Sequence, residues 1–222
     1  MVDAELSMLL RRSKVSPYIA GGRAKRLFDV FIAVVAIVAV SPLFFILCLL
    51  LKLTEPGPAI FRHMRIGYDG RRFQCLKFRS MVVNSDEVLN TLLKCDPKAR
   101  KEWDCTQKLT NDPRITPIGK YLRQSSLDEL PQLINVIRGD MSLVGPRPIV
   151  PSEVTRYGDK LGLYLQARPG ITGIWQVSGR NDREYDERIE MDASYVREWR
   201  FSTDLSILLR TPGAVLARNG SY

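Results

Sequence analysis

Val30–Leu51 reads VFIAVVAIVAVSPLFFILCLLL, which is 22 consecutive positions without a charged residue. A run of roughly twenty apolar residues can cross a bilayer as a helix. Ser41-Pro42 lies near its middle. Proline removes a backbone donor and clashes with the preceding turn, so the helix is expected to kink or break there. Each half is then about 17 Å long, near half of a roughly 30 Å hydrocarbon core.

Basic residues flank this apolar run on both sides. Residues 1–29 carry six Lys or Arg and three acidic residues, residues 52–81 carry seven and two, and residues 82–222 carry 20 and 19. Basic flanks prefer the cytoplasmic side, so the pattern favours a re-entrant hairpin that enters and leaves on one side. The Ser41 hydroxyl can satisfy the carbonyl that Pro42 frees. A kinked single span stays open, and a signal peptide fits least because no cleavage site precedes Lys52.

The composition limits the classes of protein that remain. The chain has 222 residues with 45% hydrophobic and 26% charged, enough for one globular domain and hardly for two. Its net charge of +9 predicts an anionic partner, and the placement of that charge favours anionic lipids over nucleic acid. The single histidine, His63, excludes a His-rich metal site and argues against a His-based triad. Four cysteines without a CxxC indicate a reducing compartment.

Beyond residue 55 the pattern predicts a compact α+β domain, mostly helical with a small β-hairpin. Ile60–Ile66 and Phe73–Phe78 are short β-like runs around the turn signal Tyr68-Asp69-Gly70. Gly139 fits the position after a helix end. The polar stretches predict helices over 85–107, 118–123, 133–138, 153–166 and 186–199. Residues 205–216 predict an interfacial amphipathic helix broken at Pro212.

Asp128-Glu129 is the sharpest chemical signal. Ser126-Leu127-Asp128-Glu129 fits a capping box, which is the simpler interpretation, although Pro131 complicates the cap. Alternatively, adjacent acids can supply one nucleophile and one oxygen ligand for a hard divalent ion. The sequence physics of the pair alone favours capping.

Basic residues around the pair shift this balance. Lys77 and Arg79 lie upstream in a predicted strand, Arg123 precedes Asp128 by five positions, and Arg147 lies between two prolines. Arginine binds phosphate through a planar fork and lysine as a point charge. Each residue alone is more often solvated or paired with a carboxylate. Beside an acidic pair and a membrane segment, together they indicate phosphoryl chemistry near lipid.

The sequence resembles the bacterial sugar transferases, the monotopic polyprenyl-phosphate hexose-1-phosphate transferases, and among them the short exopolysaccharide-type members. The resemblance runs from about Lys25 to the C-terminus and rests on six motifs in order. They are Lys25-Arg26-Leu27-Phe28-Asp29, Ser41-Pro42, Leu76-Lys77-Phe78-Arg79-Ser80-Met81, Ser126-Leu127-Asp128-Glu129-Leu130-Pro131-Gln132, the stretch 139–148 (GDMSLVGPRP) and the stretch 168–180 (RPGITGIWQVSGR).

The resemblance implies a cytoplasmic tail over 1–24, a re-entrant helix over 25–54 in the bacterial inner membrane, and a catalytic domain over 55–222 on its cytoplasmic face. It implies transfer of a hexose 1-phosphate from a UDP-sugar, UDP-galactose or UDP-glucose, to undecaprenyl phosphate, with release of UMP. This step would initiate exopolysaccharide or glycoconjugate synthesis. Asp128 is expected to attack the β-phosphorus. Glu129 and Asp128 are expected to hold Mg²⁺, with Mn²⁺ as an alternative ion.

The family also implies a set of substrate-binding residues. They are Lys77, Arg79, Arg123, Arg147, Arg168, Arg180 and Asp192. A structural role is at least as common for the glycine-rich loop that Arg180 closes, and Trp175, Trp199 and Tyr195 are typical core or interfacial aromatics. The sequence leaves the hexose and the oligomeric state open, a homodimer included. A non-catalytic membrane-surface module, with Asp128-Glu129 as a helix cap, stays the alternative function.

Overall fold

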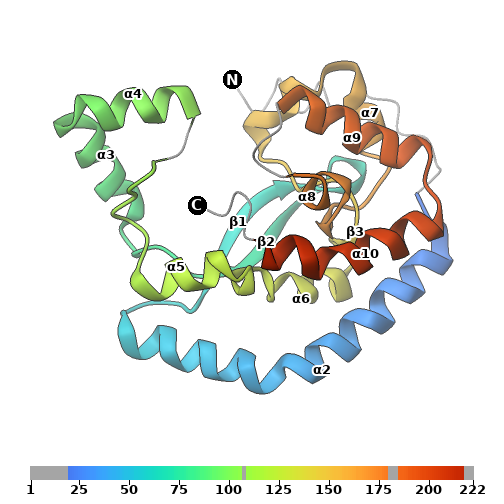
Figure 1. The fold of residues 1–222 in the computed structure, drawn as a ribbon, viewed down its shortest axis with the longest axis horizontal. Coiled ribbons are helices and arrows are strands. Elements are labelled where there is room, and N and C mark those ends of the chain that lie inside the picture. Colours follow the sequence, from blue (N-terminus) through green and yellow to red (C-terminus); the bar gives the residue numbers. More distant parts are fainter. Residues whose placement is uncertain (1–19, 107–108, 180–184, 218–222) are drawn as a thin grey trace.

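The computed structural model describes residues 20–106, 109–179 and 185–217. Figure 1 shows a body of short helices and two small sheets, a long bent helix along its base, and a two-helix arm at one side. The described part of the chain is mostly helical, as predicted.

Helix α2 (Gly22–Thr54) is the apolar segment, and it bends without breaking. Pro42 lies inside it and cannot donate to the carbonyl of Val38. The Ser41 hydroxyl donates to that carbonyl at 2.9 Å, as the sequence predicted. Within the described residues, α2 is the one helix long and apolar enough to cross a membrane.

The predicted hairpin is present. Strands β1 (Ile60–Ile66) and β2 (Arg72–Phe78) pair antiparallel, with Phe61 opposite Lys77. The turn η1 (Tyr68–Gly70) places Asp69 at φ 57°, a left-handed conformation that aspartate tolerates. The hairpin therefore presents Lys77 at a fixed position near the end of β2.

A second sheet was not predicted from the sequence. Strands β3 (Ser142–Val144) and β4 (Gly170–Thr172) form a parallel pair of three residues each. Gly145 continues the contact, because its N–H donates to Thr172 and its Cα faces the backbone of Gly170. This sheet fixes the start of the Pro146-Arg147-Pro148 loop.

The stretch predicted as one helix over 85–107 is two helices, α3 (Ser85–Cys95) and α4 (Pro97–Thr106). The break lies at Asp96, whose carboxylate accepts from the backbone N–H groups of Lys98 and Ala99 at 2.8 and 3.2 Å. Proline at the first helical position and an aspartate cap before it start α4 afresh. The two helices form the arm of Figure 1.

Short helices carry the middle of the chain: α5 (Pro117–Gln124), the 3-10 turn η2 (Leu127–Glu129) and α6 (Gln132–Arg138). Gly139 ends α6 at φ 94°, which confirms its predicted role. The helix predicted over 153–166 is instead the 3-10 segment η3 (Pro151–Lys160) followed by α7 (Leu161–Tyr164). Gly158 interrupts η3 with φ 47°.

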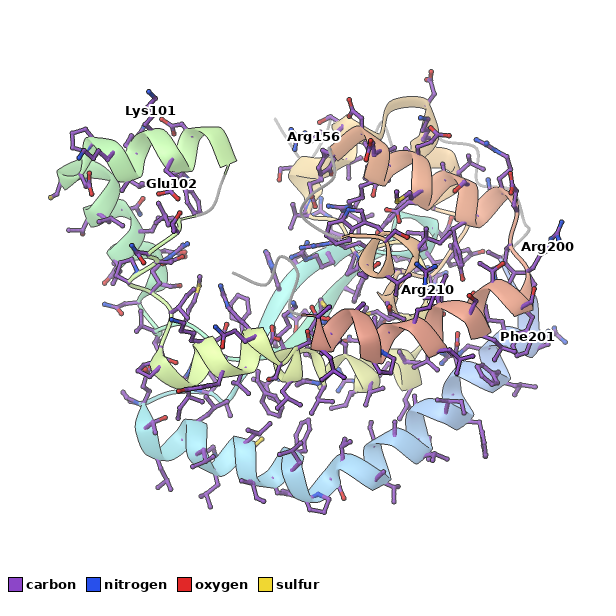
Figure 2. The ribbon with its side chains drawn as sticks, viewed as in Figure 1. Lys101, Glu102, Arg156, Arg200, Phe201 and Arg210 are labelled. Atoms are coloured by element: carbon purple, nitrogen blue, oxygen red, sulfur yellow. The ribbon has the colours of Figure 1, made fainter. Side chains whose placement is uncertain are left out.

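The C-terminal part contains α8 (Ile174–Val177), α9 (Tyr185–Arg197) and α10 (Phe201–Leu216). Helix α10 runs through Pro212 without the predicted break. Pro212 is exposed, so water can satisfy the carbonyl that it frees. Phe201, labelled in Figure 2, contacts Phe28 of α2 edge to face at 5.1 Å.

Both halves of α2 pack against the same body. In the N-terminal half, Ala33 is fully buried in the largest apolar cluster, beside Val136 of α6. In the C-terminal half, Leu47 and Leu51 pack with Phe78 of β2. Side chains on the outer face of α2 stay exposed, among them Leu27, Phe31, Val38, Phe45 and Leu53. The base of the molecule is therefore an apolar surface.

Candidate active site

The acidic pair meets Lys77 from the neighbouring strand. Lys77 Nζ lies 2.7 Å from Glu129 Oε1 and 3.7 Å from Asp128 Oδ2. The Asp128 side chain is 11% exposed, whereas Glu129 is 35% and Lys77 is 30% exposed. Asp128 is thus a nearly buried carboxylate with a cation at its side, and Glu129 forms the more open edge of the same group.

The capping interpretation of this pair is wrong. Ser126 adopts φ 56°, a left-handed conformation, and its side chain caps no helix. The pair lies in the single 3-10 turn η2, and α6 begins only at Gln132, after Pro131. The left-handed residue and the short turn present both acids towards β2.

Asn135 of α6 fixes β2 relative to the acidic pair. Its side chain is fully buried, accepts from the Leu76 N–H at 2.9 Å and donates to the Gln74 carbonyl at 2.8 Å. Leu76 precedes Lys77 in β2. Since α6 follows η2 directly, one amide side chain ties the strand that carries Lys77 to the helix beside Asp128.

Burial and the Glu129 charge raise the pKa of Asp128, against the opposing effect of Lys77 and Arg123. Burial alone would lower the pKa of Lys77. The charges of Glu129 and Asp128 outweigh this effect and raise the pKa of Lys77. The group therefore holds a charged lysine between two acids, and the carboxylate of Asp128 is poorly solvated. A poorly solvated carboxylate beside cations suits nucleophilic attack on a phosphorus atom.

Arg123 and Arg79 lie in different surroundings. Arg123 of α5 donates from Nε to the Ser80 hydroxyl at 2.8 Å, and its charge acts on Asp128. Arg79 is buried and donates to the backbone carbonyls of Leu51, Glu55 and Pro56 at 2.9–3.2 Å. The structure therefore brings Arg123 towards the acidic pair and engages Arg79 at the C-terminal end of α2.

Arg147 lies on the loop after β3. Its guanidinium is 5.2 Å from the centre of the Trp175 ring and makes no hydrogen bond or ion pair with any described residue. Burial, then the charges of Arg188 and Arg65, lower the pKa of Arg147, while Glu129 raises it. Arg147 thus stands between the acidic pair and a second group of arginines.

Asp192, predicted to bind substrate, is buried beneath this loop. It is 3% exposed, accepts from the Tyr157 hydroxyl at 2.8 Å and lies close to the backbone of Arg147. Burial raises its pKa to about 6, against the charge of Arg188. In this arrangement Asp192 supports the backbone of the Arg147 loop.

Of the two remaining predicted residues, Arg168 makes its printed contacts away from the acidic pair. Arg168 donates from Nε to the Gly139 carbonyl at 2.9 Å and lies over Tyr68. Arg180 lies outside the described residues. Trp175 and Tyr195 are buried, as predicted for core aromatics.

Sequence reasoning missed Arg188 of α9 and Glu153 of η3. Arg188 Nη1 lies 3.7 Å from Glu153 Oε1, and Arg65 Nη1 lies 3.9 Å from Glu153 Oε2. No local motif marked these residues, because they meet only through the packing of β1, η3 and α9. An arginine on a helix face with buried neighbours was the one available signal.

The acidic pair is the candidate for a divalent ion. Across residues 20–106, 109–179 and 185–217 there is no group of three or more His, Cys, Asp or Glu side chains that could hold a metal. Mg²⁺ usually binds through one or two carboxylates plus substrate phosphates and water, so two adjacent acids fit this ion. Glu129, the more exposed acid, is the more accessible ligand.

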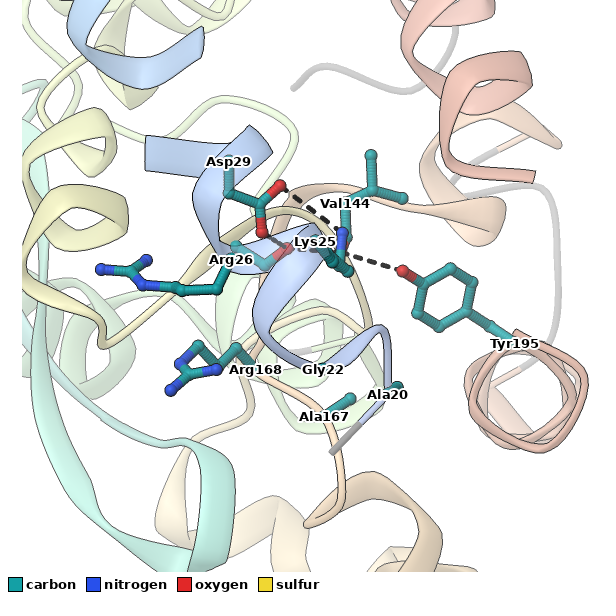
Figure 3. A pocket seen from close by; sticks show the side chains of 10 residues that line it. Ala20, Gly22, Lys25, Arg26, Asp29, Val144, Ala167, Arg168 and Tyr195 are labelled. Carbon is teal, nitrogen blue, oxygen red and sulfur yellow. Dashed lines mark hydrogen bonds and ion pairs between the residues drawn. The ribbon is translucent and has the colours of Figure 1, made fainter. Parts of the chain in front are cut away.

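Lys25 forms a separate buried network at the start of α2. Its Nζ lies 2.7 Å from Asp204 Oδ2 and 3.5 Å from Asp29 Oδ1. Tyr195 donates to Asp204 at 2.7 Å, and Ser142 donates to Asp29 at 2.7 Å. Figure 3 shows Lys25, Asp29 and Tyr195 around a small cavity of about 10 Å³, on the scale of one water molecule. The motif at 25–29 thus fastens α2 to α10 and β3.

The sequence motifs and the geometry of the candidate site together lead to one protein family. The chain matches the bacterial sugar transferase model over residues 21–218, and it belongs to that family.

Named relatives agree with this assignment. The chain is 53% identical over 199 residues to the undecaprenyl-phosphate galactose phosphotransferase of Salmonella typhimurium, covering 89% of this chain and 41% of that protein. It is 50% identical over 202 residues to the exopolysaccharide production protein ExoY of Sinorhizobium fredii, covering 91% and 89%. It is 39% identical over 223 residues to the UDP-glucose:undecaprenyl-phosphate glucose-1-phosphate transferase of Caulobacter vibrioides, covering 97% and 78%. The chain therefore spans about two fifths of the Salmonella relative and most of ExoY.

Proposed function

We propose that this chain transfers a hexose 1-phosphate from a UDP-sugar to undecaprenyl phosphate and releases UMP. The observation that carries the proposal is the nearly buried Asp128 carboxylate held beside Lys77 and Glu129. The names of the relatives support a galactose or glucose donor and a role in exopolysaccharide production, and we place the reaction at the start of that synthesis.

The reaction proceeds in two displacements at one phosphorus atom. Asp128 Oδ attacks the β-phosphorus of the UDP-sugar, a P–O bond forms to the carboxylate, and the bond to the bridging oxygen breaks as UMP leaves. An oxygen of undecaprenyl phosphate then attacks the same phosphorus. The aspartyl P–O bond breaks, the carboxylate is regenerated, and the polyprenyl diphosphate sugar is released. The covalent step divides one difficult encounter into two.

The residues of the chain manage charge in both steps. A carboxylate that approaches a diphosphate meets like charge, so cations must offset it. Lys77 already contacts both acids, and the charge of Arg123 acts on Asp128. Glu129 and Asp128 would hold Mg²⁺, which when bound offsets the negative charge of the diphosphate. Arg147, whose guanidinium has no ion pair with a described residue, is placed to bind a phosphate oxygen.

Helix α2 dips into one leaflet of the bacterial inner membrane from its cytoplasmic face. Both halves of α2 pack on one body, and its outer face carries exposed apolar side chains. A straight span would carry its two ends to opposite sides of the membrane, away from a shared body. Anionic lipids would meet the basic residues that flank α2. The lipid phosphate and the soluble donor would then reach Asp128 from opposite directions.

A non-catalytic membrane-surface module is the competing function, and it depended on Asp128-Glu129 acting as a helix cap. The left-handed Ser126 without a side-chain cap removes that reason for the pair. A buried carboxylate without a structural role costs free energy, and a catalytic role explains why it is kept.

The test is UMP release by purified protein with Mg²⁺, undecaprenyl phosphate and a panel of UDP-sugars. Asp128→Asn is expected to abolish release, and Asp86→Asn, at an exposed acid on α3, is expected to leave it unchanged. Wild-type protein incubated with donor alone should carry the sugar phosphate on Asp128. Full turnover by Asp128→Asn would rule out the nucleophile, and no release with any UDP-sugar from folded protein would favour the module.

A further inference from the structure

Arg188 of α9 is a buried cation with unused hydrogen-bond donors. Its side chain is 7% exposed. Nε and Nη2 are buried and have no hydrogen-bond partner among the described residues, while Nη1 lies 3.7 Å from Glu153. An unsatisfied buried donor is costly, more so when it is charged. A guanidinium kept in this state indicates an anion that supplies the missing acceptors.

Arg147 lies against one of the same aromatic rings as Arg188. The guanidinium carbons of Arg147 and Arg188 lie 5.2 and 5.3 Å from the centre of one ring, that of Trp175. Arg188 also lies 4.9 Å from the centre of the Tyr185 ring. Stacking on aromatic rings restricts both planar groups without using their N–H donors. Two oriented forks with free donors match the oxygens of a phosphate group.

The charges around the pair leave room for an anion. Arg65 adds a third guanidinium, which donates from Nη1 to the Pro148 carbonyl at 2.9 Å. Glu153 faces both Arg65 and Arg188, but at 3.9 and 3.7 Å it makes no hydrogen bond with either of them. Glu153 instead accepts from the Val150 N–H at 2.8 Å. Asp192, four residues after Arg188, accepts from the Tyr157 hydroxyl and lies close to the Arg147 backbone. Three cations therefore share the one carboxylate of Glu153 in addition to that of Asp192.

The position of Arg188 in the fold indicates which phosphate group it would bind. In Figure 1, α9 lies on the opposite side of the body from α2. The turn η2 lies between α5 and α6 in sequence, and its Leu127 packs with Leu47 and Leu51 of α2. Arg147 lies within electrostatic reach of both α9 and η2, because the charges of Arg188 and Glu129 both shift its pKa. A phosphate at Asp128 is on the lipid side, and a phosphate at Arg188 is on the water side.

We propose that Arg188, together with Arg147 on the shared Trp175 ring, forms a second phosphate subsite, which binds the nucleotide phosphate of the UDP-sugar and of the UMP product. This inference rests on the proposed transfer reaction and adds a binding residue to it. The subsite holds the leaving group, while Asp128 and Lys77 act on the phosphate that is transferred.

The test compares Arg188→Gln and Arg188→Lys with the wild-type protein. Arg197→Gln, at an exposed arginine further along α9, is the matched control. UMP affinity is measured by calorimetry, which needs no turnover, and KM is measured separately for the UDP-sugar and for undecaprenyl phosphate. Losing a charge-assisted pair of hydrogen bonds should weaken UMP and donor binding about 10- to 100-fold in Arg188→Gln. Arg188→Lys should fall in between, and the KM for undecaprenyl phosphate should not change.

Each other outcome overturns a defined part of the inference. A UMP affinity within about twofold of wild type in Arg188→Gln, with turnover intact, removes the subsite and leaves the proposed function standing. A rise in KM for undecaprenyl phosphate alone assigns the phosphate to the lipid. Wild-type protein that binds UMP but never releases it from a UDP-sugar refutes the proposed function, and the UMP affinities still decide the subsite. If Arg188→Gln does not fold, Arg188→Lys decides in the same assays, and an unchanged UMP affinity in it overturns the subsite.

Discussion

Replacing Asn135 by leucine tests how the fold holds the candidate active site. The side chain is fully buried and satisfies two backbone groups of β2, the Leu76 N–H at 2.9 Å and the Gln74 carbonyl at 2.8 Å. Leucine has a similar size but no polar atoms, so the buried Leu76 N–H and the partly buried Gln74 carbonyl would both lose their partner. Each such group costs about 1–3 kcal/mol, which gives a loss of about 2–6 kcal/mol.

This loss converts to a fall in Tm of about 4–24 °C, because 1 kcal/mol corresponds to about 2–4 °C in a chain of this size. Circular dichroism at 222 nm, with protein in one detergent, measures the change. Asn90→Leu, at an exposed position of α3, is the control and should leave Tm within about 2 °C of wild type.

The same variant should also lose catalytic rate. Lys77 follows Leu76 in β2, so loosening the strand displaces the cation that contacts Asp128 and Glu129. The rate of UMP release should fall at temperatures at which the variant is still folded. A variant with wild-type Tm would show that Asn135 does not hold β2. A variant with lower Tm and unchanged kcat would show that the position of Lys77 does not depend on it.

Three further substitutions test other contacts. Lys25→Met leaves two buried carboxylates without their cation and should cost about 3–5 kcal/mol. Burial already raises the pKa of Asp29, so its ionised form destabilises the fold and is neutralised as pH falls. The loss of Tm relative to wild type should therefore be larger at about pH 8 than at about pH 5. Arg79→Met removes three hydrogen bonds to the end of α2 and should cost about 1–3 kcal/mol in thermal unfolding, with an unchanged KM for the UDP-sugar. A raised KM without a fall in Tm would show that Arg79 binds the substrate instead. Gly145→Ala places a Cβ against the backbone of Arg168 and 2.9 Å from Gly170 N, so it should lower Tm and abolish UMP release, and normal kinetics would contradict the tight β3–β4 contact.

Local sequence signals predicted the parts of the fold that local interactions form. The β1–β2 hairpin follows from alternating residues around a turn, and the Ser41-Pro42 bend follows from one missing donor and one nearby hydroxyl. The parallel β3–β4 pair could not be predicted in this way. Its strands have three residues each and lie 26 residues apart in sequence, and Gly145 matters only because another backbone packs against it.

For the candidate site, too, local sequence signals predicted some residues and long-range packing determined the rest. Asp128, Glu129 and Lys77 came from motifs and Arg123 from its spacing before Asp128, and the four lie together or act on one another in the structure. Arg188 was missed, because its significance comes from Trp175 and Glu153, which reach it from other elements. Arg79 was predicted to bind substrate, yet its guanidinium meets carbonyls at a helix end more than twenty residues away. A motif indicates that an arginine matters, and only packing determines what it touches.

The placement of Arg79 has a consequence for how membrane and chemistry are connected. Lys77 and Arg79 are two residues apart at the end of β2, and one contacts the acidic pair while the other binds the last turn of α2. A shift of the C-terminal half of α2 would move Arg79, and through two peptide units it would move Lys77 as well. Because Lys77 Nζ lies 3.7 Å from Asp128, a displacement of about 1 Å is a large fraction of that contact. The short stretch from Lys77 to Arg79 therefore connects the position of α2 in the membrane with the charge around Asp128.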